Sequence, residues 1–174
     1  ETFENKPYIQ RQQLYNWNVE DWTWKEWSIY VARYFGDVSQ IDDAIGRVVN
    51  YLEDQNLIKD TVVIYTTDHG DMAGGHRTME KVHNLYEDIV HVPLVVRWDG
   101  VVPAGVTCDD FVNHYLDLGP TILDIAQLPT PESYQGISMY PRLWQEYGRR
   151  DVSRRRRGLV PHLQAERLDR RRHQ

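Results

Sequence analysis

The spacing of apolar residues along the chain predicts one long helix in the first third of the sequence. Between Thr23 and Asn56, apolar residues recur at spacings of three and four, as on one face of an amphipathic helix. A coiled-coil seam would show a similar pattern. We favour a helix that covers one face of a sheet, because glycines interrupt the stripe and it stops at Leu52. The stripe consists of Val31, Tyr34, Val38, Ile41, Ile45, Val48 and Leu52.

Continuous apolar runs predict two strands. Residues Thr61–Tyr65 are mostly β-branched or apolar, which is typical of a strand buried on both faces. Residues Val92–Trp98 predict the next strand, with Pro93 near its start, where a missing N–H does least harm. A helix, a short turn and a buried strand form half of a crossover unit, so the predicted fold class is α/β.

Shorter elements are predicted in the second half of the chain. Residues Val82–Asp88 predict a short helix with Leu85 facing inward. Residues Asp117–Ala126 predict a further helix with Pro120 in its first turn, where proline is well tolerated. The segment that follows, up to Tyr147, is expected to be a surface loop with local anchors.

Composition describes an ordinary globular protein of 174 residues, with 41% hydrophobic and 26% charged residues. We expect no membrane span, because no window approaches about 20 apolar residues. The single cysteine, Cys108, excludes an internal disulfide and a cysteine-based zinc site. The aromatic residues from Tyr8 to Trp27 are interpreted as a loop anchor, with a sugar-stacking platform as the alternative. The chain starts without Met or a signal pattern, so we expect the biological N-terminus elsewhere and the compartment stays open.

Charge divides the chain into two expected parts, an α/β domain over residues 1–148 and an arginine-rich tail over residues 149–174. The first part carries 10 Lys and Arg against 23 Asp and Glu, and the tail carries 10 Arg against 3 Asp and Glu. Such a tail is interpreted as a disordered end or as sequence translated out of frame. A basic arm for nucleic acid or acidic membrane is the less favoured alternative, so neither partner is expected.

The loop after the first predicted strand carries the candidate chemistry. Asp68 and His69 follow the strand end, where both side chains can converge, and a carboxylate with an imidazole suits a divalent cation. A simple turn is the alternative. His76 and Lys81 follow a pair of glycines. A lysine near an oxyanion stabilises developing charge, whereas a solvated surface lysine is its alternative.

Many short motifs recur here in an order that is more specific than any one of them. They are Gly46-Arg47, Leu52, Leu57, Asp60–Ile64, Thr67–Asp71, Gly74–His76, Lys81, Tyr86-Glu87, Val92–Leu94, Asp117-Leu118, Pro120-Thr121 and Gly136–Ser138. Over roughly residues 28–144 the chain strongly resembles the later part of sulfatases, which belong to the alkaline phosphatase superfamily. This resemblance implies a partial alkaline-phosphatase-like sheet flanked by helices.

The resemblance also implies roles for the loop. Asp68 and His69 match the pair that completes the family's metal site, usually with Ca²⁺, and Mg²⁺ or Mn²⁺ are the alternatives. Lys81 matches the lysine that contacts the sulfate and its ester oxygen, and His76 matches a histidine that lines the site. Asp71 is expected to order the loop. The implied partner is a small sulfate ester or a sulfated sugar.

The sequence also departs from the family. Sulfatases carry two adjacent metal-binding aspartates and a Cys-x-Pro/Ala-x-Arg motif, whose Cys or Ser becomes a formylglycine nucleophile, in an N-terminal half that has no match here. Cys108 lies downstream of the Asp68–His69 pair and without the motif's arginine. We therefore expect a piece of a metal-dependent sulfuric ester hydrolase that is inactive as given. The alternatives are a piece of a phosphodiester or phosphonate monoester hydrolase, and a non-catalytic remnant that binds a cation or a partner.

Overall fold

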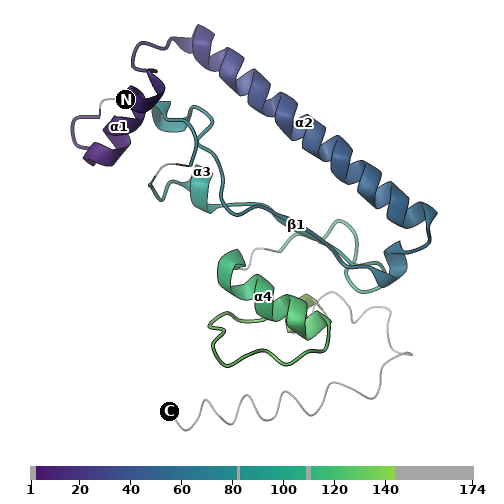
Figure 1. The fold of residues 1–174 in the computed structure, drawn as a ribbon. Coiled ribbons are helices and arrows are strands. Elements are labelled where there is room, and N and C mark those ends of the chain that lie inside the picture. The colour runs from purple at the N-terminus through teal and green to yellow at the C-terminus, as the bar shows by residue number, and fades with distance from the viewer. Residues whose placement is uncertain (1–2, 82, 109–110, 144–174) are drawn as a thin grey trace. The chain divides into compact units, whose positions relative to one another are not determined.

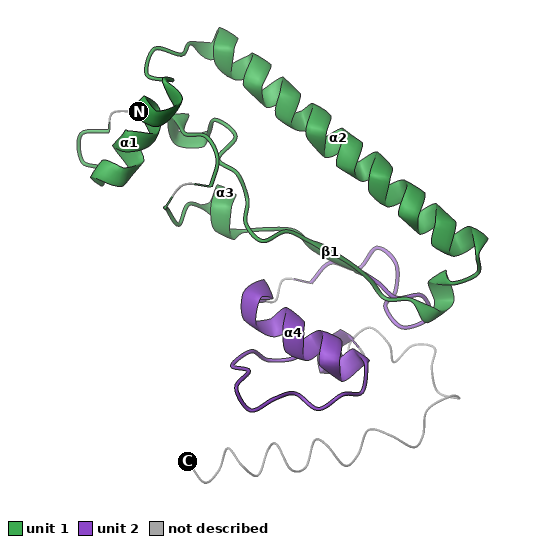
Figure 2. Cartoon of the chain, in the orientation of Figure 1, with its two compact units in different colours: residues 1–96 green, residues 97–174 purple. Residues whose placement is uncertain are grey.

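The structure is a computed structural model that describes residues 3–81, 83–108 and 111–143. The elements follow one another as α1 (Tyr8–Trp17), α2 (Trp24–Asp54), η1 (Ile58–Asp60), β1 (Val63–Thr66), η2 (Gly75–Arg77), α3 (Glu87–Val90), β2 (Leu94–Arg97), α4 (His114–Ile125) and α5 (Tyr140–Arg142), as Figure 1 shows. β1 and β2 pair in a two-stranded sheet. The chain divides into two compact units at residues 96 and 97 (Figure 2). The expected tail, residues 149–174, lies outside the described residues.

The long helix predicted over Thr23–Asn56 is confirmed as α2. Its start is fixed by a capping box, in which Thr23 donates from its backbone N–H to Oε2 of Glu26 over 2.8 Å. Its end is fixed by Asn56, whose φ of 57° turns the chain into the left-handed region. No helix in the described ranges is both long and apolar enough to cross a membrane.

The apolar stripe of α2 is only partly covered. Trp27 is the buried residue of this helix, whereas Val38, Ile41 and Val48 are 45%, 50% and 60% exposed. Within the described residues, three positions of the predicted stripe therefore remain exposed. The expectation that the first strand is buried on both faces is wrong, since Tyr65 of β1 is exposed. A sheet of two short strands offers too little surface to cover both elements.

The buried core of the first unit lies where the N-terminal part of α2 meets α1 and the glycine-rich loop. Leu14, Val19, Trp27 and Met79 form its centre, and Phe3, Trp22 and Tyr30 pack against them. The rings of Trp22 and Trp27 meet edge to face with centroids 4.9 Å apart. The loop-anchor interpretation holds for these two aromatic residues, but Trp24 and Tyr15 are exposed.

The second strand is confirmed as β2, but the helix before it starts later than predicted. α3 begins at Glu87, and the N–H of Ile89 bonds to the carbonyl oxygen of Tyr86 over 2.9 Å. This start turns Ile89 inward, where it is buried. The prediction that Leu85 faces inward is wrong, because Leu85 precedes the helix and is 88% exposed.

In the second unit, α4 starts earlier than predicted, so Pro120 lies inside the helix rather than in its first turn. A proline has no N–H, and the carbonyl of Leu116 therefore loses its usual helical donor. The backbone of Gly136 packs onto this carbonyl so closely that an added Cβ atom would lie 1.8 Å from its oxygen. Only glycine fits there.

The loop that contains Gly136 is fastened to α4 by two polar side chains. The Asp117 carboxylate accepts a hydrogen bond from the N–H of Ile137 over 2.7 Å. The Thr121 hydroxyl, with no exposed surface, donates to the carbonyl of Asp117 over 2.5 Å and accepts from the N–H of Met139 over 2.9 Å. The residues of the motifs at 117–121 and 136–138 thus fasten the loop around Gly136 to α4.

Candidate metal and anion site

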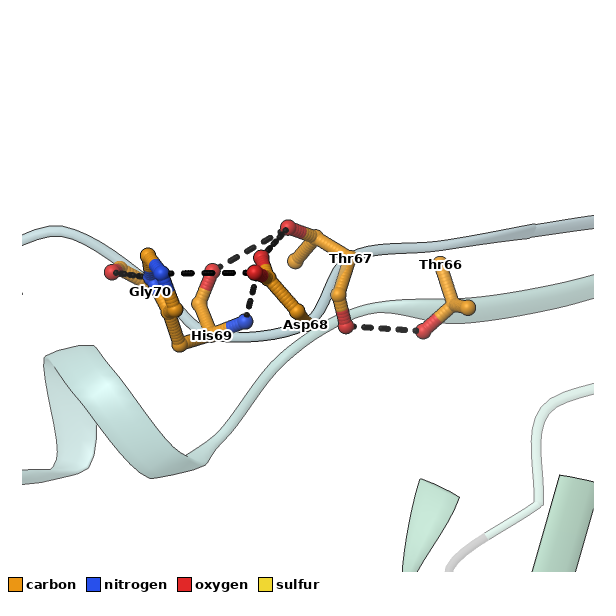
Figure 3. A network of polar contacts seen from close by, with 5 residues as sticks. All are labelled: Thr66, Thr67, Asp68, His69 and Gly70. Carbon is orange, nitrogen blue, oxygen red and sulfur yellow. Dashed lines mark hydrogen bonds and ion pairs between the residues drawn. The ribbon is translucent and has the colours of Figure 1, made fainter. Parts of the chain in front are cut away.

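Asp68 and His69 follow β1 after Thr67, and their side chains point toward one another (Figure 3). Nε2 of His69 lies 3.4 Å from Oδ2 of Asp68, and the backbone N–H of His69 donates to Oδ1 of Asp68 over 2.9 Å. Two ligands at right angles on one Ca²⁺, each at about 2.4 Å, lie about 3.4 Å apart. The separation of the two atoms therefore suits adjacent ligands of one cation.

The second ring nitrogen of His69 fixes the orientation of its imidazole. Nδ1 lies 2.9 Å from the carbonyl oxygen of Gly70. A carbonyl oxygen can only accept, so Nδ1 carries the proton, and in the neutral ring Nε2 keeps a lone pair. A backbone carbonyl bound to the far nitrogen is a common way to orient a metal-binding histidine. His69 thus has the tautomer that a cation at Nε2 needs.

Asp68 is held by local hydrogen bonds in its ionised form. The N–H of His69 and, more weakly, the hydroxyl of Thr67 at 3.2 Å donate to Oδ1 of Asp68 (Figure 3). The same Thr67 hydroxyl lies 3.1 Å from the carbonyl oxygen of His69. The backbone N–H of His69 is the main cause that lowers the pKa of Asp68 below its ordinary value. The carboxylate therefore stays negative near neutral pH.

The pair is a partial ligand set. Across residues 3–81, 83–108 and 111–143, no three His, Cys, Asp or Glu side chains come together as a metal site. A hard carboxylate oxygen with a neutral imidazole fits Mn²⁺, Mg²⁺ or Ca²⁺ in its chemistry. Two such groups satisfy only part of the coordination of these ions, so water, substrate or further protein groups have to complete it.

Gly70 brings the loop against the backbone at the start of α3. Its N–H donates to the carbonyl of Ile89 over 2.9 Å. A Cβ atom at Gly70 would lie 1.8 Å from the carbonyl oxygen of Asp88. The carbonyl of Gly70 also orients His69, so this close approach of two backbones positions the imidazole.

Asp71 orders the same loop, as expected. Its Oδ1 accepts from the N–H of Ala73 over 2.7 Å and from the hydroxyl of Tyr30 over 3.3 Å. Burial and the negative charge of Asp71 raise the pKa of Tyr30 to about 12. Tyr30 therefore stays protonated and ties the loop to α2.

His76 and Lys81 lie further along the loop and are both exposed. The His76 ring stacks on the ring of Tyr86, with centroids 4.0 Å apart and planes 14° from parallel. No hydrogen bond or ion pair joins Lys81 to Asp68 or His69 within the part of the chain that the structure describes. The structure thus brings together two of the four candidate residues and places the other two on the same loop.

The sequence analysis missed two residues near this loop. The ammonium group of Lys6 donates to the hydroxyl of Tyr86 over 2.6 Å, although the two residues are 80 positions apart. The Tyr86 hydroxyl lies 3.3 Å from Oε1 of Gln10. Tyr86 was noted only as part of a motif. Lys6 lies before the first recognised motif, and no local pattern marks it.

The fold and the site define a class of protein. A strand in an α/β sheet is followed by a glycine-rich loop whose carboxylate and imidazole converge. The profile of the family described as Sulfatase matches residues 3–128. The chain belongs to the sulfatase family.

Individual relatives agree with this assignment. The N-acetylglucosamine-6-O-sulfatase of Bacteroides thetaiotaomicron is 34% identical over 124 residues, which are 71% of this chain and 22% of that protein. The structure of BT4656 in complex with its substrate D-glucosamine-2-N,6-O-disulfate has a TM-score of 0.56 and 34% identity, over 63% of this chain and 22% of that one. The structure of BT1596, a 2-O GAG sulfatase, has a TM-score of 0.69 and 25% identity, over 76% of this chain and 29% of that one. The chain thus spans about a quarter of their length.

Proposed function

We propose that this chain supplies part of the metal and sulfate site of a sulfuric ester hydrolase. The observation that carries the proposal is the 3.4 Å approach of His69 Nε2 to Asp68 Oδ2, while His69 Nδ1 is engaged by Gly70. With the proton on Nδ1, two lone pairs face each other across this gap. They repel unless a cation or a second proton lies between them. A site of this kind is built to bind a positive ion.

Each loop residue then has a separate task. Asp68 and His69 bind the cation, which when bound supplies Lewis acidity toward a sulfate oxygen. Lys81 contacts the sulfate group, and its positive charge offsets the negative charge that develops on the ester oxygen. His76 lines the site. The low pKa of Asp68 and the Nδ1–H tautomer of His69 keep both ligands in the form that binds a cation.

We propose a sulfated sugar as the substrate class and Ca²⁺ as the preferred ion. The relatives named for N-acetylglucosamine 6-O-sulfate and for 2-O-sulfated glycosaminoglycan support the substrate class. The carboxylate ligand supports a hard cation, and the family resemblance favours Ca²⁺ over Mg²⁺ or Mn²⁺. We place the catalytic domain in residues 1–148 and assign no catalytic role to residues 149–174.

Paramagnetic Mn²⁺ tests the cation site directly, because it broadens the NMR signals of nearby protons. Substoichiometric Mn²⁺ should broaden the ring signals of His69, and excess Ca²⁺ should restore them. The Asp68→Asn substitution should abolish the broadening, because it removes the charge and one ligand oxygen.

The chain offers a matched control for this measurement. His91 Nδ1 lies 2.7 Å from Oε1 of Glu87, so it is also an imidazole beside a carboxylate, and both side chains are exposed. We expect its ring signals to stay sharp at the same Mn²⁺ concentration. Equal broadening of His69 and His91, or broadening of His69 that survives in the Asp68→Asn variant, contradicts the proposal.

The chain itself should not turn over an aryl sulfate, because its sequence holds no Cys-x-Pro/Ala-x-Arg motif. The absorbance of released nitrophenol measures this reaction. Turnover that is lost in the Lys81→Ala variant would show that this sequence supplies its own nucleophile.

A further inference from the structure

An open groove of about 350 Å³ lies on the first unit. Its lining comes from two distant stretches of the chain, Lys6, Pro7 and Gln10 on one side and Leu85 and Tyr86 on the other. This volume is at the lower end of the range for small-molecule sites, about 300–1,000 Å³. It is large enough for one sugar ring.

The groove combines a positive charge with apolar surface. The Lys6 ammonium bonds to the Tyr86 hydroxyl and lies 5.1 Å from the centroid of the Tyr86 ring. An ammonium has three donors, so Lys6 can bind an anionic oxygen in addition to the partners it already has. Leu85, 88% exposed, and the Tyr86 ring offer apolar surface of the kind on which the C–H face of a sugar packs.

The groove is joined to the catalytic loop through one contact. The Tyr86 ring that lines it stacks on the ring of His76, which lies between Asp68 and Lys81 in the sequence. A ligand in the groove therefore contacts Tyr86, which in turn contacts His76, a residue of the proposed site.

We propose that this groove is a sugar subsite that recognises an anionic group, with Lys6 as the residue that determines this specificity. The subsite rests on the proposed function, because it would bind a second sulfate or a carboxylate on the sugar whose sulfate ester lies at the Asp68–His69 pair. Lys6 selects for negative charge, the Tyr86 hydroxyl holds Lys6 in place, and Gln10 offers a polar group to the sugar hydroxyls.

Titration of the labelled full chain with D-glucosamine-2-N,6-O-disulfate, followed by NMR, tests this subsite. The Tyr86 ring signals should shift, and D-glucosamine 6-sulfate, which lacks the second sulfate, should produce no comparable shift. Lys6→Gln should weaken binding about tenfold, since it removes a charge-assisted hydrogen bond. Lys6→Arg keeps the charge and should retain most of the affinity. Arg11→Gln removes an exposed charge from α1, outside the groove lining, and should change the affinity less than twofold.

Each outcome decides the proposal. Equal affinity of the wild type and Lys6→Gln, equal shifts with the monosulfated sugar, or an equal loss in Arg11→Gln overturns it. The contact between the rings of His76 and Tyr86, measured as a nuclear Overhauser effect, shows that Lys6→Gln keeps the local fold. The Mn²⁺ broadening at His69 separates the two proposals, because it should persist in Lys6→Gln. If Mn²⁺ does not broaden the His69 signals in the wild type, the cation site is rejected. The shift of the Tyr86 signals tests the groove separately.

Discussion

Substitution of Gly70 by Ala tests the close backbone approach that positions His69. The new Cβ atom would lie 1.8 Å from the carbonyl oxygen of Asp88, whereas real Cβ contacts stay beyond 3.0 Å. The two backbones must therefore separate by 3.0 − 1.8 = 1.2 Å or more. This movement stretches the 2.9 Å hydrogen bond from Gly70 to Ile89. With about 1 kcal/mol for the bond and about 1–3 kcal/mol for overpacking, Gly70→Ala should lower the free energy of unfolding by about 2–4 kcal/mol.

Urea unfolding followed by tryptophan fluorescence measures this loss, since Trp27 is buried in the same unit. Gly36→Ala is the matched control, because nothing lies within 4 Å of its new Cβ atom in α2. Removing a glycine from a helix should raise stability there by about 0.5–1 kcal/mol. Gly70→Ala should also weaken the Mn²⁺ broadening at His69. Equal urea midpoints for the two variants would refute the argument that two backbones touch at Gly70.

Three further predictions concern other contacts. Thr121→Val should lower the free energy of unfolding of its unit by about 1–3 kcal/mol, because the buried hydroxyl of Thr121 is the partner of the N–H of Met139. Ser39→Ala, at an exposed hydroxyl on α2, should cost far less in the same urea assay. Tyr30 should titrate near pH 12 by ultraviolet absorbance. Since its folded pKa is raised, the stability it contributes is present below about pH 10 and falls as the pH rises toward 12. The Tyr30→Phe substitution should remove this loss of stability at alkaline pH. The Asp68 carboxyl should titrate below the ordinary aspartate pKa in a carbon NMR titration. The stability it contributes is present above the pKa of the unfolded state and falls as the pH drops through the pKa of the folded state. A pKa at or above the ordinary value would show that the N–H of His69 does not bond to this carboxylate.

Local signals in the sequence were sufficient for the long helix. The Thr23 cap with Glu26 three residues later, the apolar period and the left-handed Asn56 are all local, and α2 agrees with its prediction within two residues at each end. The two strands were also predicted, because runs of β-branched residues favour strands. Burial was predicted less well, since the exposure of Val38 or Tyr65 depends on what else packs there and not on the residue itself.

The errors at α3 and α4 have a tertiary cause. Leu85 was assigned inward from its place in an apolar pattern, but the close approach of Gly70 to Asp88 and Ile89 sets where α3 begins. Pro120 was placed in a first turn because proline favours that position. The structure tolerates it inside α4, where the backbone of Gly136 packs against the carbonyl that proline leaves without a donor. Neither contact has a signal within its own segment.

The candidate site was predictable in part. Asp68 and His69 were identified because they follow a strand, and the structure places their side chains together. The contact between Lys6 and Tyr86 joins residues 80 positions apart, so periodicity and turn chemistry carry no information about it. Finding such a contact requires the fold.

The uncovered stripe of α2 has a practical consequence for every measurement on this chain. The helix has 31 residues, about 46 Å at 1.5 Å per residue, and several of its large side chains meet water along that length. Apolar surface of this kind favours self-association, which grows with protein concentration. Ion and sugar titrations therefore need repetition at several dilutions, and a stoichiometry that changes on dilution reports on chains that adhere to one another through this helix.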